Sequence, residues 1–455
     1  MNTNGNYWQK ITNKIEIFFL IYILLQPFLD LVSYFGTSVS TIVRALIMVV
    51  GFVYLLLYPN KKIRWGTTIY VVFLGIFMVI HTINNYMIKD PYNLMQEFTY
   101  AVKSAYVVEM LIVYAAVFLS LSKKMDWQKI VQRNMFINFV IISLVMLMAV
   151  LTGTGKQSYE RYEKWDFFPT EGHSGWFYSA NDLGALLAIG FSGMLLYVLN
   201  TKDVKKKYLL APFILLVAWA MQEIGTKVGI GGALIPLTIG TVIALIYALF
   251  TKKGWANVLI LAVSTVLLFV YLPASPAGEN INISYYKEVP VDPEVPIDED
   301  DSVEKEPEYE LDTENLPQRL LSGRDRYLAD IQEDWAVAPT SQKILGMGPG
   351  GNYEESLKII EIDYFDWYYS YGILGSILLF LPLLYFGIRV LYSFIKYRLK
   401  QITPTLLMVG VAVCLSLGIA AFAGHILLNP ASGIYFAIFY AYLLVISAYP
   451  KDNLL

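Results

Sequence analysis

The chain has few charged residues and a single cysteine. Asp, Glu, Lys and Arg make up 16% of its 455 residues, whereas hydrophobic residues make up 56%. A soluble globular domain, in which about a quarter of the residues are charged, is therefore excluded. Cys414 stands alone, which excludes a disulfide framework. Lys and Arg, 34 in all, do not outnumber the 37 Asp and Glu, so no nucleic-acid partner is expected.

Long apolar runs recur along the chain. A transmembrane helix needs about 20 consecutive apolar residues, and helices satisfy every backbone group within one span. We therefore predict an all-α fold: a polytopic helical membrane protein with about twelve transmembrane helices and one long extracytoplasmic loop containing short helices. The first run lacks a small-residue cleavage site and is expected to be retained. The runs are 15–34, 41–58, 67–85, 101–121, 129–151, 176–199, 208–223, 229–250, 255–272, 371–393, 403–425 and 430–449.

Lys and Arg gather in alternate loops. Basic residues favour the cytoplasmic side of a membrane, so both termini are expected in the cytoplasm and the long polar segment outside. This predicts an N-terminal bundle of about nine spans in 1–272, an extracytoplasmic loop in 273–370 and about three spans in 371–455. The basic loops are 61–64, 123–124, 202–207, 252–253 and 389–400.

The loop itself divides into two parts. Residues 288–314 form an acidic tract interrupted by proline, which buries too little apolar surface to fold alone. We expect a disordered insertion there, with attraction of a cation or a substrate as the alternative. The part from 317 to 370 carries helical patterns and the candidate chemistry.

Several ionisable residues fall in the outer halves or at the outer ends of the expected spans. A charge near the bilayer centre costs roughly 2.5–3.5 kcal/mol, so such residues usually have a partner or a function. A solvated cavity on the outer side would explain their shared position. The alternatives are local: Asp30 and Arg44 can pair across the first hairpin, and His425 can be a water-exposed interfacial residue. The set is Asp30, Arg44, Lys103, Glu109, Asn181, Asp182, Glu223, Lys227 and His425.

The first helical pattern of the loop carries an arginine pair. Gln318–Ala336 has apolar residues at helical spacing, and Ser322 three residues before Asp325 predicts a helix start near Gly323. Arg324 and Arg326 then lie in the first turn, where free backbone N–H groups and guanidinium groups both favour an anion such as phosphate. Solvated arginines on a surface helix are the alternative.

A Gly/Pro turn and three carboxylates follow. Residues 346–351 read GMGPGG with no following Lys-Ser/Thr, so they are not a nucleotide-binding loop. We expect a tight turn that joins two helices, the second capped by Asn352 with Glu355 and continuing through Glu361. Asp363 and Asp366 would share a helix face, whereas Glu361 would point elsewhere. Any of them becomes a candidate base if burial raises its pKa; solvated carboxylates are the alternative.

Three motifs together resemble the O-antigen ligase/polymerase family. They are GWFYSANDLGALL at 175–187, GTKVGIGG at 225–232 and the SGR, GMGPGG and YGILG elements of 322–375. The resemblance covers most of 170–390. It implies a bacterial cytoplasmic-membrane enzyme that transfers glycans from undecaprenyl-diphosphate carriers, with its active site on the outer face.

The resemblance also implies roles for residues. Arg324 matches the loop arginine that contacts the carrier diphosphate, and Lys227 stands where the family usually has arginine, which loses the bidentate fork. Glu361 falls near the position of a histidine in the family's ligases. Arg324, Arg326 and Lys227 would neutralise the leaving diphosphate, and Glu361 or Asp363 would accept the proton of the attacking hydroxyl. The supporting residues would be Asp30, Arg44, Asn181, Asp182 and His425.

No cofactor is expected, because the sequence shows no clear metal-ligand cluster; acidic residues near Asp363 still leave Mg²⁺ or Mn²⁺ open. The partners implied are an undecaprenyl-diphosphate-linked oligosaccharide and the lipid bilayer, with a flippase and a chain-length regulator as candidates. The leading hypothesis is a polymerase of repeat units. A ligase that moves finished glycan, a transporter or flippase of lipid-linked sugars, and a non-catalytic scaffold are the alternatives. The absence of an internal repeat disfavours the transporter.

Overall fold

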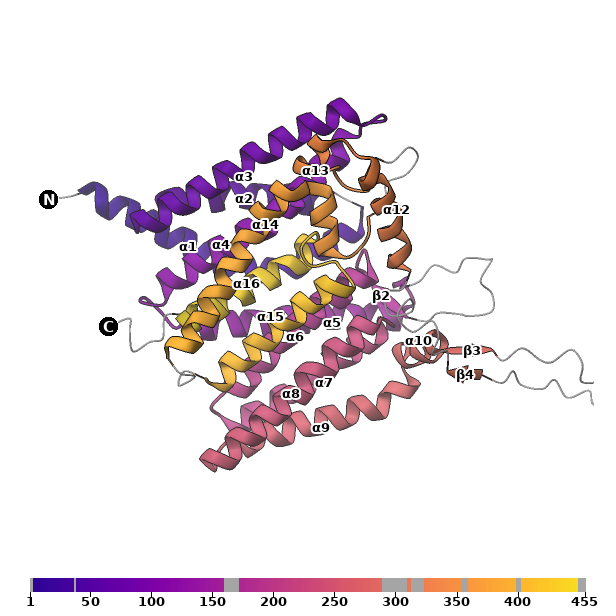
Figure 1. The fold of residues 1–455 in the computed structure, drawn as a ribbon. Helices are drawn as coiled ribbons and strands as arrows, with labels where there is room; N and C mark the ends of the chain where they lie inside the picture. The colour runs from indigo at the N-terminus through magenta and orange to yellow at the C-terminus, as the bar shows by residue number, and fades with distance from the viewer. Residues whose placement is uncertain are drawn as a thin grey trace, which may run out of the picture.

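The computed structural model describes residues 3–36, 38–158, 172–288, 309–311, 323–352, 359–397 and 402–448 (Figure 1). Almost all of the acidic tract 288–314 therefore lies outside the described residues. Twelve long helices form the bundle: α1 (Thr3–Tyr34), α2 (Val39–Leu57), α3 (Lys61–Ile88), α4 (Leu94–Leu121), α5 (Trp127–Thr152), α6 (Ala180–Asn200), α7 (Val204–Glu223), α8 (Lys227–Thr251), α9 (Trp255–Tyr271), α14 (Asp363–Lys396), α15 (Pro404–Phe422) and α16 (Pro430–Ala448).

Shorter elements cover one end of this bundle. Within the described residues they are two antiparallel strand pairs and four short helices: β1 (Lys156–Gln157) with β2 (His173–Gly175), β3 (Tyr286–Glu288) with β4 (Tyr309–Leu311), η2 (Leu272–Ala274), α10 (Pro276–Tyr285), α12 (Arg324–Val337) and α13 (Thr340–Leu345).

Within the described residues, eleven helices are long and apolar enough to cross a membrane. The predicted all-α, polytopic fold class is confirmed. The helix outside this set is α7, which begins with three lysines at 205–207 and ends at Glu223. It nevertheless packs against α5, α6, α8 and α9. About twelve spans were predicted; eleven helices are long and apolar enough to cross a membrane, and α7 packs among them.

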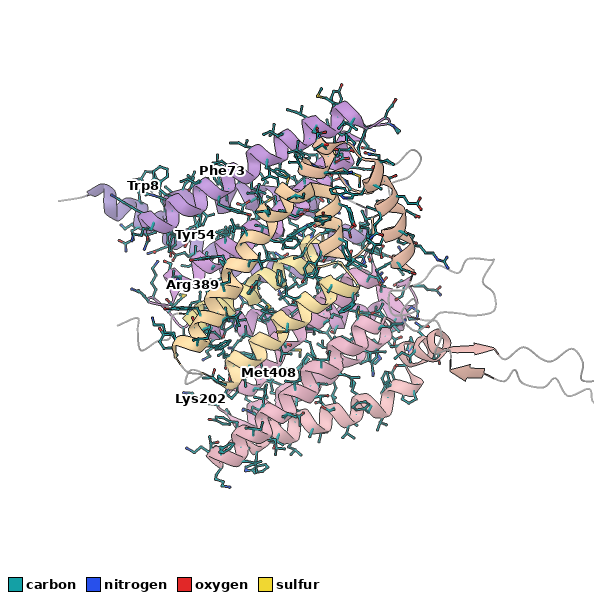
Figure 2. All side chains as sticks on the ribbon, in the orientation of Figure 1. Trp8, Tyr54, Phe73, Lys202, Arg389 and Met408 are labelled. Carbon is teal, nitrogen blue, oxygen red and sulfur yellow. The ribbon has the colours of Figure 1, made fainter. Side chains whose placement is uncertain are left out.

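Helices α4, α6 and α16 form the centre of the bundle. They are the most buried of the long helices, whereas α3 and α9 are the most exposed and lie at opposite edges of the bundle (Figure 1). Large apolar side chains such as Phe73 of α3 project from the outer surface (Figure 2). In a protein that packs in lipid, such a surface needs no polar cover.

The two ends of the bundle differ. Helix α1 begins and α16 ends at one end, while α10, α12 and α13 lie at the other (Figure 1). Lys202 and Arg389 lie toward the end where α1 begins (Figure 2). This arrangement agrees with basic loops and termini on one side of the membrane. Which side that is remains a prediction from the distribution of Lys and Arg.

Glycines pack the loop tightly onto the start of α14. That helix kinks at Gly372, whose φ is 64°, a left-handed conformation that favours glycine. A Cβ atom on Gly346 would lie 2.1 Å from the Ser370 carbonyl oxygen, and the Gly348 N–H donates to that carbonyl at 2.9 Å. The Gly/Pro turn therefore lies between α13 and α14, whereas the second helix was expected to start near Asn352.

Candidate active site

Arg324 is the first residue of α12. Gly323 precedes it with a φ of 80°, so the helix starts where the sequence predicts. The Arg324 side chain is buried, and its Nη2 donates to Glu361 Oε2 at 3.1 Å. Arg326 follows on the exposed face of the same helix and does not line the cavity described below. Its role with a diphosphate stays a prediction.

Glu361 lies in a loop, not in a helix. The prediction of a helix running through it is wrong: its φ is 60°, and α14 begins only at Asp363. The Asp366 carboxylate accepts the backbone N–H groups of Ile360 at 2.9 Å and Ile362 at 3.1 Å, which holds the turn around Glu361. The expected cap formed by Asn352 with Glu355 lies partly outside the described residues.

Asp363 holds a second loop, between α15 and α16. Its buried carboxylate accepts three successive backbone N–H groups, from His425 at 3.0 Å, Ile426 at 2.8 Å and Leu427 at 2.7 Å. Both Asp363 oxygens are engaged in this way, whereas Glu361 directs its carboxylate to other side chains. Of Glu361, Asp363 and Asp366, Glu361 is the one that lines a cavity.

His425 connects carboxylates from two segments. Its Nδ1 lies 2.8 Å from Asp182 Oδ1, at the start of α6, and its Nε2 lies 3.7 Å from Glu361 Oε2. With the Arg324 contact, a continuous charged chain runs from α12 through the 361 loop and the 425 loop to α6. We call Arg324, Glu361, His425 and Asp182 the charged chain.

Contacts within the charged chain shift the pKa values of His425 and Glu361. Burial lowers the pKa of His425, but hydrogen bonding and charge from Asp182 and Glu361 outweigh it and raise the pKa to about 10. The contact with His425 lowers the pKa of Glu361; burial opposes this shift, and the charge of Arg324 adds to it. At neutral pH the histidine is therefore an imidazolium and Glu361 a carboxylate.

A cavity of about 1030 Å³ lies on one side of the charged chain. Arg324, Glu361 and His425 line one part of it, together with Lys227, the first residue of α8. Asn181 of α6 also faces it. The rest of the wall is mostly apolar and comes from α8 and α15: Ile235, Ile239, Val411, Leu415, Ile419 and Phe422. We call this space the larger cavity.

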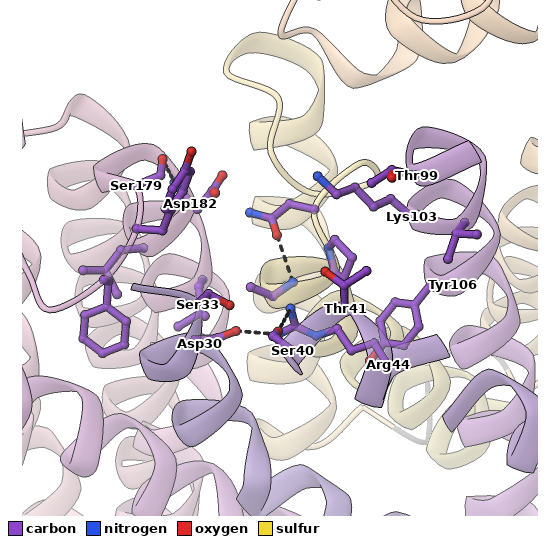
Figure 3. A pocket seen from close by; sticks show the side chains of 18 of the residues that line it. Asp30, Ser33, Ser40, Thr41, Arg44, Thr99, Lys103, Tyr106, Ser179 and Asp182 are labelled. Carbon is purple, nitrogen blue, oxygen red and sulfur yellow. Dashed lines mark hydrogen bonds and ion pairs between the residues drawn. The ribbon is translucent and has the colours of Figure 1, made fainter. Parts of the chain in front are cut away.

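A cavity of about 380 Å³ lies on the other side. Figure 3 shows Asp182 on one wall, Lys103 of α4 on the opposite wall, and Asp30 with Arg44 between them. Arg44 Nη2 contacts Asp30 Oδ1 at 2.5 Å, which confirms the expected pair across the first hairpin. We call this space the smaller cavity. The Asp182–His425 contact lies between the two cavities, because Asp182 lines the smaller one and His425 lines the larger one.

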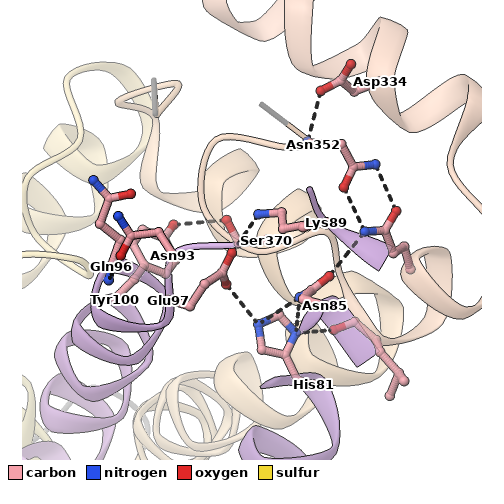
Figure 4. Close-up of polar contacts among 12 residues, drawn as sticks. His81, Asn85, Lys89, Asn93, Gln96, Glu97, Tyr100, Asp334, Asn352 and Ser370 are labelled. Carbon is pink, nitrogen blue, oxygen red and sulfur yellow. Dashed lines mark hydrogen bonds and ion pairs between the residues drawn. The ribbon is translucent and has the colours of Figure 1, made fainter. Parts of the chain in front are cut away.

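A second polar cluster, which no sequence motif predicted, joins α3, α4 and α13. Lys89 Nζ donates to Glu97 Oε1 at 2.6 Å, His81 Nδ1 lies 2.8 Å from the Leu345 carbonyl oxygen, and Gln342 Nε2 donates to Asn85 Oδ1 at 3.1 Å (Figure 4). We call these residues the anchoring network. A Lys and a Glu eight residues apart, flanking the turn between two spans, were the available signal.

In the described part of the chain, no three His, Cys, Asp or Glu side chains gather in a group that could hold a metal ion. The expectation that basic residues neutralise the leaving group without a metal therefore stays a prediction.

Comparison with known proteins identifies the family of this sequence. The sequence model of a family described as "O-antigen ligase like membrane protein" matches residues 12–448, nearly the whole chain. A search of curated proteins and a search of solved structures each gave no match. The family match covers all four segments that form the charged chain. The chain belongs to the O-antigen ligase like membrane protein family.

Proposed function

We propose that this protein is a membrane glycosyltransferase. It would act at the extracytoplasmic face on an undecaprenyl-diphosphate-linked glycan and polymerise the repeat units of a surface polysaccharide. The observation that carries the proposal is the larger cavity, which joins a cationic end to an apolar end. A polyprenyl diphosphate has the same two parts in the same order.

The cationic end suits the diphosphate. Arg324, Lys227 and the imidazolium of His425 supply positive charge. Two carboxylates, those of Glu361 and Asp182, contact His425, so the group keeps one positive charge. Fixed cations that face the leaving oxygen stabilise the charge that develops as the glycosidic bond breaks. Arg324 offers a guanidinium fork for paired phosphate oxygens, whereas Lys227 acts as a point charge.

The apolar end suits the polyprenyl tail. Ile235 and Ile239 of α8 and Phe422 of α15 line the cavity and are exposed at the surface of the bundle. Since this surface would face lipid, a chain can lie partly in the cavity and partly in the bilayer. The hydrophobic effect favours that placement in proportion to the apolar area buried.

Glu361 is the proposed general base. It accepts the proton of the acceptor hydroxyl as that oxygen bonds to the anomeric carbon, and the carbon–oxygen bond to the diphosphate breaks with its electron pair on the diphosphate. Asp363 acts through the loop it holds, by fixing His425. A carboxylate where the resemblance places a ligase histidine favours polymerisation over ligation.

Replacing Arg324 by Ala tests the proposal. The variant is expressed at normal level, and surface and carrier-linked glycans are resolved by length. Glu333→Ala, on an exposed position of the same helix, is the matched control. Loss of one preorganised donor to the leaving oxygen costs about 10²–10³ in rate, so single repeat units should replace long chains.

Other outcomes are equally informative. Full-length chains stranded on the lipid carrier would indicate a ligase. Unchanged glycans in the Arg324→Ala cells, with the variant present in the membrane, would overturn the catalytic role of this arginine and favour transport or scaffolding.

A further inference from the structure

We propose that the smaller cavity binds the terminal sugar of the acceptor glycan, and that this sugar carries one acidic group, a carboxylate or a phosphate. The inference rests on the proposed function, because a transferase that holds its donor in the larger cavity needs a site for the second substrate. Four observations on the smaller cavity carry it.

Its position is the first. Asn181 and Asp182 are neighbours in the first turn of α6, yet Asn181 faces the larger cavity and Asp182 the smaller one. Asp182 in turn contacts His425, which lines the larger cavity. An occupant of the smaller cavity therefore has one end at the boundary with the donor, where an attacking hydroxyl is needed.

Unused hydrogen-bonding groups are the second observation. Asp30 and Arg44 are only 7% and 9% exposed. Although they pair with each other, Asp30 Oδ2 and Arg44 Nε have no hydrogen-bond partner among the described residues. Buried polar groups normally have partners. A sugar hydroxyl can donate to Asp30 Oδ2 and accept from Arg44 Nε, so a carbohydrate matches both.

Charge is the third. In the wall of the smaller cavity, Arg44 is balanced by Asp30, and Asp182 is balanced by His425. Lys103 also lines this cavity and has no ion pair or hydrogen bond to any described residue. One positive charge is thus left over, and the complementary occupant carries one negative charge.

Size and aromatic lining are the fourth. The cavity volume of about 380 Å³ falls within the range of about 300–1,000 Å³ typical of small-ligand sites. Of the aromatic residues in its wall, Tyr178 is exposed, whereas Tyr106 and Phe177 are buried. The ring of Tyr178 therefore offers an apolar surface for the C–H face of a sugar.

Cysteine labelling separates the two cavities. Cys414 is the single cysteine and lines the larger cavity. Thr41 is exposed and lines the smaller one (Figure 3). Labelling of Thr41→Cys in a Cys414→Ala background therefore reports whether the smaller cavity is occupied. The purified full chain is reacted with N-ethylmaleimide in nanodiscs. Undecaprenyl diphosphate, glucuronic acid, glucose 6-phosphate and glucose are added separately, the sugars at equal concentration.

Glucuronic acid or glucose 6-phosphate should slow labelling of the Thr41→Cys protein and leave Cys414 unaffected, and whichever protects more identifies the acidic group. Glucose should protect about tenfold less, because it lacks the charge-assisted contact to Lys103. Adding Lys103→Met should abolish the preference for the acidic sugar. Lys343→Met, which removes a lysine of α13 outside both cavities, should keep it.

The failures are distinguishable. If undecaprenyl diphosphate protects Cys414 but no sugar protects the Thr41→Cys protein, this inference is overturned and the proposed function stands. Equal protection by all three sugars overturns the acidic specificity. If undecaprenyl diphosphate leaves Cys414 labelling unchanged, the donor site itself is wrong, and with it the assignment of the second cavity.

Discussion

Two groups of charged residues lie at the same end of the bundle, and they differ in exposure. In the charged chain, the side chains of Glu361 and Asp182 are 34% and 32% exposed and line cavities. In the anchoring network, the side chains of Lys89 and Glu97 are 2% and 1% exposed and line neither cavity. Charges of the first group can reach a substrate, whereas those of the second can only hold parts of the protein together.

The anchoring network has a clear mechanical task. His81 and Asn85 of α3 contact Leu345 and Gln342 of α13, so the loop segment that follows α12 is attached to the bundle. Gln342 also exchanges hydrogen bonds with Asn352. Since α12 carries Arg324, the network fixes the loop on which the charged chain depends.

The largest expected effect comes from breaking the network. Lys89→Met leaves Glu97 buried without its 2.6 Å partner, and an uncompensated buried charge costs about 3–5 kcal/mol. The melting temperature measured in nanodiscs should fall. The double variant Lys89→Met, Glu97→Gln should recover much of the loss. An unchanged melting temperature with lost transfer would place Lys89 in the chemistry instead.

The next effect separates two neighbouring carboxylates. Glu361→Gln removes the proposed base and should lower the transfer rate by about 10²–10⁴ without changing the melting temperature. Asp363→Asn weakens the hydrogen bonds to the 425 loop and should cost about 1–3 kcal/mol in stability. Rates and melting temperatures of both variants are compared. A stable Asp363→Asn protein that is less active than Glu361→Gln would reverse the two roles.

The smallest effect is a shift with pH. Transfer needs ionised Glu361, so the rate falls as pH drops through a pKa that lies below its ordinary value of about 4.5. His425 is the main cause of that lowering. In His425→Gln the pKa of Glu361 should rise, and the rate should begin to fall at higher pH. Rates between pH 3 and 7 show the shift; identical acid limbs would exclude Glu361 as the titrating base.

Patterns local in sequence predicted much of the fold. Apolar runs predicted the spans, and the start of α12 near Gly323 was predicted correctly, because helix starts depend on a few adjacent residues. The N-cap is Gly323, with no side-chain cap hydrogen bond, and Ser322, which was expected to cap the helix, lies outside the described residues. The Asp30–Arg44 pair could also be predicted from the sequence, since one short hairpin brings the two residues together. The three lysines at the start of α7 help to explain why this helix is not among the eleven that are apolar enough to cross a membrane.

The charged chain could not be predicted as a unit. It joins residues 182, 324, 361 and 425, which lie far apart in the sequence. No local sequence pattern indicates that the segments carrying them converge. The left-handed φ of Glu361 could not be predicted either, because Asp366 holds this turn through hydrogen bonds from the backbone N–H groups of Ile360 and Ile362. The prediction of a helix through Glu361 was therefore wrong, because local spacing does not report these contacts.

Reconstitution tests the central claim most directly. The purified protein is placed in nanodiscs with one substrate alone, an undecaprenyl-diphosphate-linked repeat unit from producing cells, and products are resolved by length while released undecaprenyl diphosphate is counted. The account predicts chains longer than one repeat, with one undecaprenyl diphosphate released for each bond formed. Intact single units after incubation with wild-type protein, under conditions in which undecaprenyl diphosphate still protects Cys414, would contradict polymerisation.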